Sequence, residues 1–224
     1  MNRKEIFIFG ICIIFSLIMG ILSNDIVIGG LILLTGLLNG YLAGEGKRSN
    51  YILGFINYVL RAYVSFKNHL YGMTIFYTCI FAPLQIKGFL EWNKTLDEEK
   101  NVLVREFTLK NSIIITISCV LGSFVLGYLL NLIPNQQLSW LDASSNCINL
   151  CGIILMILRF KEAWWVWLTN NIIDLTIWII LTVYGGEGAI MMLMVSIGYL
   201  LLNIYGIIKW NQKAKHESKE GGKA

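Results

Sequence analysis

Eight apolar runs of about twenty residues follow one another along the chain, and they constrain its fold more than any other feature. They lie at 5–23, 26–44, 49–67, 71–92, 110–132, 142–160, 163–184 and 188–210. At about 1.5 Å per residue in a helix, each run can cross about 30 Å of hydrocarbon. Lipid leaves only helices or closed barrels, and near-continuous apolar runs favour helices over alternating barrel strands. The sequence therefore predicts an all-α integral membrane protein with eight transmembrane helices.

Charged residues are scarce and unevenly placed. They make up 14% of the chain, against about 25% in soluble domains. The lysines and arginines on one side of the predicted membrane are Arg3, Lys4, Lys47, Arg48, Lys94, Lys100, Arg105, Lys110, Arg159, Lys161, Lys209, Lys213, Lys215, Lys219 and Lys223. The opposite side has Lys67 alone, so both termini are predicted to be cytoplasmic. The net charge of +4 reflects this topology and does not indicate a nucleic-acid partner.

The first run follows Arg3 and Lys4 and is similar to a cleaved signal sequence. However, its apolar stretch exceeds the usual core of about 7–15 residues, and no small-x-small cleavage site follows it. We therefore predict that segment 1–24 is retained as an extra N-terminal transmembrane helix.

An internal repeat relates two three-helix stretches. The motif Gly-x-x-x-Trp-Asn occurs at 88–93 and again at 206–211, and Asn57 corresponds to Asn171 at a similar spacing. Two such units joined by one helix face the same way, as in some transporters with a central substrate site. The predicted units are a three-helix repeat at 25–93, a cytoplasmic loop and linker helix at 94–141, a second repeat at 142–211, and a disordered cytoplasmic tail at 212–224. The fold class is thus one extra helix followed by a 3+1+3 arrangement.

Signatures of catalysis and of resident metals are absent from the sequence. Cys147 and Cys151 share a helix face, but no histidine or carboxylate joins them, and buried cysteine often behaves as a small hydrophobe. Segment 41–49 is only faintly similar to a phosphate-binding loop, because Tyr41 and Arg48 replace its first glycine and its hydroxyl residue. We predict no enzyme activity, no metal and no cofactor.

The run at 163–184 carries the strongest candidate binding surface. At 100° per residue, a stripe of about 80° contains Trp164, Trp167, Asn171, Asp174 and Trp178. In lipid the amide and the carboxylate would lack partners, so the stripe is predicted to face the bundle interior. Interfacial anchoring is the alternative for the indoles, and it suits the neighbouring Trp165 better. Indoles with amides suit a flat heteroaromatic ligand, and a cationic ring gains further from indole faces.

A second stripe occupies the run at 49–67 and consists of Asn50, Gly54, Asn57, Arg61 and Ser65. A charge at the membrane midplane costs on the order of 3 kcal/mol, so Arg61 needs a partner. Asp174 lies at the corresponding depth of the second unit. A structural ion pair and a role in selectivity are both open for these two residues.

The run at 71–92 contains Pro83 and Gln85. The proline is predicted to break the helix locally, and the glutamine would then present its amide at membrane depth.

Four motifs between about Gly40 and Trp210 occur together: Asn50-Tyr51 with Gly54 and Asn57, Leu70-Tyr71-Gly72, Pro83-x-Gln85-x-x-Gly88-x-x-x-Trp92, and Arg159-x-x-Glu162-x-Trp164-x-x-Trp167-x-x-x-Asn171. Through these motifs the sequence resembles the PnuC family of bacterial vitamin transporters. Asp174 and Arg61 depart from the family pattern, in which a small hydroxyl residue and an aromatic or aliphatic residue are usual. If the two were unpaired, they would alter selectivity.

The resemblance implies a fold similar to the SWEET sugar transporters and a multi-pass protein of the bacterial cytoplasmic membrane. It implies facilitated uptake of nicotinamide riboside, a trimer, and a cytosolic kinase that traps the product in NAD biosynthesis. Thiamine and, less favourably, riboflavin are alternative substrates, and a non-transporting binding or receptor subunit is the alternative of another class. The candidate substrate-binding residues are Trp164, Trp167, Asn171, Asn57, Asp174, Asn170 and Gln85, and the structural or gating candidates are Arg61, Trp178 and Pro83.

Overall fold

The computed structural model describes residues 3–94, 103–106 and 109–221. Helices dominate this part of the chain, which otherwise contains one isolated β-bridge, between Arg105 and Phe160. The helices are α1 (Arg3–Leu22), α2 (Ile28–Gly44), α3 (Asn50–Lys67), α4 (Tyr71–Ile75), the π-helix η1 (Phe76–Phe81), α5 (Ala82–Asn93), α6 (Leu109–Asn131), α7 (Ser139–Ile157), α8 (Ala163–Val183) and α9 (Ala189–Gly221). Each predicted run coincides with one helix, except that 71–92 comprises α4, η1 and α5 in direct succession. Residues 95–102 and 107–108, which belong to the predicted cytoplasmic loop, lie outside the described residues.

Six of these helical segments are long and apolar enough to cross a membrane, with α4, η1 and α5 counted as the single segment Tyr71–Asn93. Helix α2 is equally apolar but has only 17 residues. Helix α3 is less apolar because its inward stripe is polar. All five members of that stripe are buried, and their partners are therefore neighbouring helices rather than lipid. The chain is a multi-pass helical membrane protein.

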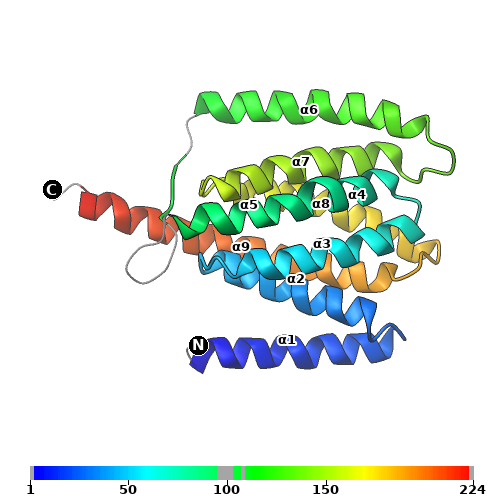
Figure 1. The fold of residues 1–224 in the computed structure, drawn as a ribbon, viewed down its shortest axis with the longest axis horizontal. Helices are drawn as coiled ribbons and strands as arrows, with labels where there is room; N and C mark the ends of the chain where they lie inside the picture. The colour runs from blue at the N-terminus through cyan, green and yellow to red at the C-terminus, as the bar shows by residue number, and fades with distance from the viewer. Residues whose placement is uncertain (1–2, 95–102, 107–108, 222–224) are drawn as a thin grey trace.

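The helices run side by side as a bundle, with α1 and α6 outermost on opposite sides (Figure 1). Helix α1 packs on α2, and α6 packs on α7. Between these outer helices, α2 contacts both α3 and α9, while α8 contacts both α7 and α9. The N-terminus and the C-terminus lie at the same end of the bundle (Figure 1). This arrangement leaves α2, α3, α7, α8 and α9 to enclose the centre.

The tail beyond residue 211 is not disordered as predicted, because α9 continues without interruption to Gly221. The tail sequence is rich in lysine, glutamate and alanine, which are good helix formers, and extending an existing helix needs no new nucleus. Tertiary contacts hold its first turn: Ala214 is buried, and Lys213 Nζ donates to the carbonyl of Glu45 at 2.7 Å. The polar composition of the tail therefore indicates that α9 leaves the apolar part of the bundle, and it does not indicate that the helix ends.

The predicted break at Pro83 is also corrected. The chain remains helical through this residue, and the turn before it widens into the π-helix η1. Proline lacks an N–H and its ring crowds the carbonyl four residues earlier, so a wider turn accommodates it without ending the helix. Pro83 itself is exposed at the bundle surface.

The two copies of the Gly-x-x-x-Trp motif make matching contacts at one end of the bundle. Trp92 Nε1 donates to the carbonyl of Met156 at 3.1 Å, and Trp210 Nε1 donates to the carbonyl of Ala43 at 3.1 Å. Each indole thus binds the first helix of the other predicted repeat. The two indole rings also contact each other, with centroids 6.0 Å apart.

Each motif glycine gives room to an aromatic ring of another helix, which is α3 for Gly88 and α8 for Gly206. A Cβ at Gly88 would lie 2.2 Å from the ring of Tyr51, and one at Gly206 would lie 2.3 Å from the ring of Trp164. These distances are far below van der Waals contact, so any side chain at either glycine must displace a ring.

We expect Gly206→Ala to lower the thermal unfolding midpoint of the detergent-purified protein, because overpacking costs about 1–3 kcal/mol. The Trp164 ring is only 1% exposed and is packed against neighbouring indoles, so it cannot move aside easily. Gly10→Ala in α1 is the control, since its Cβ meets nothing within 4 Å and alanine favours a helix. An unchanged midpoint for Gly206→Ala would show that this close approach is not required.

Candidate functional site

A cavity lies between α2, α3, α7, α8 and α9 and extends from Arg61 and Asp174 to the first turn of α8, which holds Trp164. Its lining combines aromatic rings, amides and one pair of charged side chains. The lining residues are Asn39, Gly40, Ala43, Tyr58, Arg61, Asn149, Trp164, Trp167, Asn170, Asn171, Asp174, Tyr199 and Asn203. Concave sites with aromatic walls and a few convergent polar groups are typical of small-molecule binding.

Two indoles from α8 form the aromatic wall. The rings of Trp164 and Trp167 meet edge to face, with centroids 5.5 Å apart and an interplanar angle of 83°. Trp164 is held rigidly, since its ring also contacts Trp210 at 6.0 Å and lies against Gly206. Trp167 is only half-buried, so its ring remains accessible from the cavity. A flat ligand can therefore stack on Trp167 while Trp164 fixes the wall behind it.

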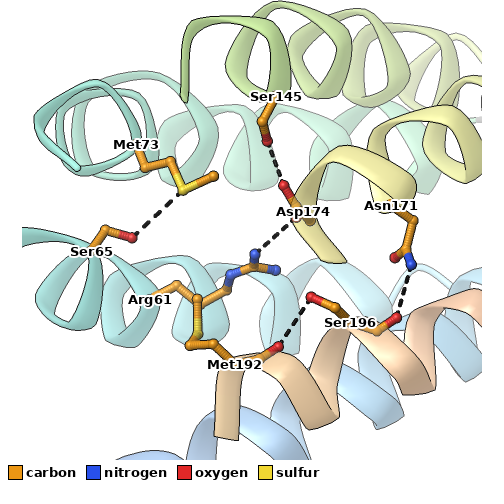
Figure 2. A network of polar contacts seen from close by, with 8 residues as sticks. All are labelled: Arg61, Ser65, Met73, Ser145, Asn171, Asp174, Met192 and Ser196. Atoms are coloured by element: carbon orange, nitrogen blue, oxygen red, sulfur yellow. Dashed lines mark hydrogen bonds and ion pairs between the residues drawn. The ribbon is translucent and has the colours of Figure 1, made fainter. Parts of the chain in front are cut away.

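Amides on the same helix supply the polar groups. Asn171 Nδ2 donates to the carbonyl of Ser196 at 2.8 Å, which fixes the orientation of this amide against α9 (Figure 2). The neighbouring Asn170 is buried, and its Oδ1 has no hydrogen-bond partner in the described part of the chain. The Nε1 of Trp164 is likewise buried without a partner there. Since unpaired buried polar atoms are costly, this acceptor and this donor are ready to bind a ligand.

An ion pair closes one side of the cavity. Arg61 Nη2 lies 3.2 Å from Asp174 Oδ2, and both side chains are buried, at 6% and 8% exposed (Figure 2). The other carboxylate oxygen, Oδ1, accepts a hydrogen bond from Ser145 Oγ at 2.5 Å. The Arg61 guanidinium also lies over the ring of Tyr77, 5.2 Å from its centroid. The alternative of unpaired charges is thereby excluded, and α3 is tied to α8 through the pair.

The inward stripe predicted on α8 has the expected orientation. Trp164, Asn171, Asp174 and Trp178 are buried, whereas Trp165 is 56% exposed on the opposite face. Trp178, however, lies outside the cavity lining and is part of the packed core.

Asn57 and Gln85 are buried, but neither lines the cavity. Asn57 Nδ2 donates to the carbonyl of Ile32 at 2.8 Å and to Thr35 Oγ1 at 3.0 Å, so its amide joins α3 to α2. Gln85 packs against Gly54, where a Cβ would lie only 2.4 Å from Oε1. These two amides thus stabilise the helices behind the site in this structure.

Five polar or aromatic lining residues were not singled out from the sequence: Asn39, Tyr58, Asn149, Tyr199 and Asn203. The three asparagines had a usable signal, because an isolated amide inside an apolar run is expensive and faces protein. The tyrosines had none, because aromatic residues are common in such runs and their helical periodicity does not identify the neighbouring helix.

Comparison with known proteins yields matches over most of the chain. A family model described as nicotinamide mononucleotide transporter matches residues 26–212, a range that contains every lining residue of the cavity. The nicotinamide riboside transporter PnuC of Neisseria mucosa is 30% identical over 190 residues, which cover 82% of this chain and 72% of that protein. The PnuC of Haemophilus influenzae is 26% identical over 185 residues, covering 81% and 78%. A crystal structure of the vitamin B3 transporter PnuC superposes with a TM-score of 0.84 at 27% identity, covering 96% of this chain and 94% of that one.

Proposed function

The chain belongs to the nicotinamide mononucleotide transporter family, and from this premise we propose that it carries nicotinamide riboside into the cell. It is a membrane transporter and not an enzyme. The two curated relatives are both named as nicotinamide riboside transporters, and their similarity covers more than four fifths of this chain.

The charge of the cavity supports the riboside over the mononucleotide. Among the described residues that line the cavity, Arg61 is the only lysine or arginine, and it is bound to Asp174. A phosphate entering this space would meet no available cation, and burying an unpaired anion is strongly unfavourable. A riboside brings only a pyridinium ring, a carboxamide and hydroxyls. This absence of an available cation is the observation that carries the choice of substrate.

The aromatic and polar groups of the cavity lining also match the chemical groups of the riboside. A cationic aromatic ring stacks favourably on indole faces, which Trp167 and Trp164 provide. The carboxamide and the ribose hydroxyls can both donate and accept, and they match Asn170 Oδ1 and Trp164 Nε1. Asp174 does not select for the cation by itself, because Arg61 and Ser145 already bind its two oxygens.

Uptake of labelled nicotinamide riboside into proteoliposomes tests the proposal. We expect flux that equilibrates without ATP or an ion gradient and that is competed by unlabelled riboside. Nicotinamide mononucleotide, thiamine and riboflavin are the matched competitors, and each should leave the flux unchanged at equal concentration. If the riboside showed no flux and labelled thiamine or riboflavin were taken up instead, that vitamin would be the substrate. Binding without any flux would indicate a receptor subunit.

The proposal extends to the architecture, namely a 3+1+3 fold of two parallel units with α6 as linker and α1 outside the repeat. The matching hydrogen bonds of Trp92 and Trp210 support it, because each crosses to the first helix of the other unit. Predominance of basic residues at one side supports cytoplasmic termini. A trimer and a cytosolic kinase that traps the riboside by phosphorylation complete the proposal, both by family resemblance.

A further inference from the structure

A fully buried carboxylate lies at the outer end of the bundle, the end opposite the two termini. Asp142 is in the first turn of α7, is 0% exposed and is not among the residues that line the cavity. In the described part of the chain, no ion pair includes it. A carboxylate without a counter-charge is costly to bury, so its oxygens need several hydrogen-bond donors.

Three groups from three segments donate to this carboxylate. The N–H of Gly72 in α4 donates to Oδ2 at 3.0 Å, and Gln136 Nε2 in the α6–α7 loop donates to the same oxygen at 2.8 Å. Asn146 Nδ2, one turn further along α7, donates to Oδ1 at 2.7 Å. An ionised carboxylate is an acceptor only, so this set of donors matches the charged form of Asp142.

The carboxylate caps a helix to which it does not belong. The segment Tyr71–Asn93 is continuously helical, and the residue before it, Leu70, has an apolar side chain that makes no capping hydrogen bond. The first two N–H groups, of Tyr71 and Gly72, donate instead to Gln136 Oε1 at 2.9 Å and to Asp142 Oδ2. N–H groups at a helix start lack partners within the helix and favour a negative charge. The start of α4 is therefore held by α7 and the loop before it.

This contact is close, and it lies beyond the outer limit of the cavity. A Cβ at Gly72 would lie 2.7 Å and 2.8 Å from the two oxygens of Asp142. Met73, the next residue, accepts a hydrogen bond at its sulfur from Ser65 Oγ at 3.9 Å, and both residues are 0% exposed (Figure 2). Ser65 is one turn along α3 from Arg61, which lines the cavity. The buried residues Ser65 and Met73 thus close the outer end in this structure.

We propose that Asp142 is a positioning residue, a latch that keeps the outer end closed by tying α4 to α7. The proposal rests on the proposed transport function, because a carrier must open this end to admit a substrate from outside. In the predicted repeat, α4 and α7 belong to different units, so releasing this bond lets the units separate. Asp25 is at the corresponding place before α2, but its Oδ1 accepts from the N–H of Gly29 in α2 at 2.9 Å and caps that helix.

Side-specific labelling of Ser65→Cys tests the latch, in a chain whose five native cysteines are replaced by alanine. Intact cells are treated with a membrane-impermeant methanethiosulfonate. Asp142→Asn presents an NH₂ group where a donor now meets an oxygen, and it should label about tenfold faster, the effect of losing one hydrogen bond to a charged group. The labelling rate follows the population of the outward-open state. Gly72→Ala should act in the same direction, because its methyl group displaces the carboxylate.

Asp25→Asn is the matched control and should leave the labelling of Ser65→Cys unchanged. A second reporter, Ala43→Cys, lines the cavity near the other end of the bundle and is 2% exposed in the native chain. In inside-out vesicles, Asp142→Asn should slow its labelling, since the outward-open state gains population at the expense of the inward-open one. Labelling is measured without substrate, so failure of the latch and failure of the proposed substrate are separate results.

Three results would overturn the proposal. One is unchanged labelling of Ser65→Cys in both Asp142→Asn and Gly72→Ala. Another is an equal increase in Asp25→Asn, which would assign the effect to the loss of any outer carboxylate. The third is faster labelling of both reporters in Asp142→Asn, which would mean that the residue stabilises the whole bundle and not its outer closure.

Discussion

Trp167→Ala should abolish most of the uptake of nicotinamide riboside while leaving the bundle folded. The indole lines the cavity and is only half-buried, so its removal exposes little of the core. Stacking on an aromatic side chain contributes about 1–3 kcal/mol per ring, which corresponds to about 5- to 150-fold in affinity. The measurement is initial uptake into proteoliposomes over a range of substrate concentrations.

Trp165→Ala is the matched control for this prediction. It removes an indole from the same helix, but from a side chain that is 56% exposed on the face opposite the inward stripe. It should leave the affinity for the riboside unchanged. Equal loss of uptake in both variants would mean that the indoles of α8 act by anchoring the helix in the membrane. The cavity would then lose its main support as the substrate site.

The second large effect is expected from breaking the buried ion pair. Arg61→Met should destabilise the protein by about 3–5 kcal/mol, because it leaves the Asp174 carboxylate buried without its counter-charge. Ser145 remains as a hydrogen-bond donor to Oδ1, but one hydroxyl cannot compensate for a full charge. The measurement is the denaturant or thermal unfolding midpoint in a defined detergent.

A double variant separates the charge effect from simple loss of packing. Arg61→Met/Asp174→Asn removes both charges and keeps an amide that can accept from Ser145, so most of the lost stability should return. Replacing a whole buried pair by neutral groups is often nearly neutral in stability. If the single and the double variant were equally unstable, the arginine would be acting through packing on Tyr77 and not through its charge.

The site could be predicted from the sequence where the membrane made orientation unambiguous. Asn171 and Asp174 cannot face lipid, so the spacing along α8 was sufficient to turn Trp164 and Trp167 inward with them. The same logic indicated that Arg61 needs a partner and made Asp174 the candidate by its depth, while the pairing itself stayed open. In each case the argument depends on one helix and on the cost of an unsatisfied polar group.

What could not be predicted depends on the neighbouring helix. A buried amide can face a cavity, as Asn170 does, or bind a backbone carbonyl, as Asn57 does with Ile32. Periodicity is identical in the two cases, and only the packing of α2 against α3 decides between them. The prediction for the tail beyond residue 211 failed for a related reason, because the helix there is held by a contact with Glu45, directly after the C-terminal end of α2.

The matching hydrogen bonds of the two motif tryptophans also bear on how the protein is made. Trp92 emerges from the ribosome 64 residues before Met156, whose carbonyl it binds. Trp210 emerges 167 residues after Ala43, so the carbonyl that it binds is synthesised long before the last helix is inserted. The contacts between the two halves are thus completed only when α9 is in place, because α9 carries the donor that binds α2. A chain interrupted before α9 would leave the carbonyl of Ala43 without its indole donor.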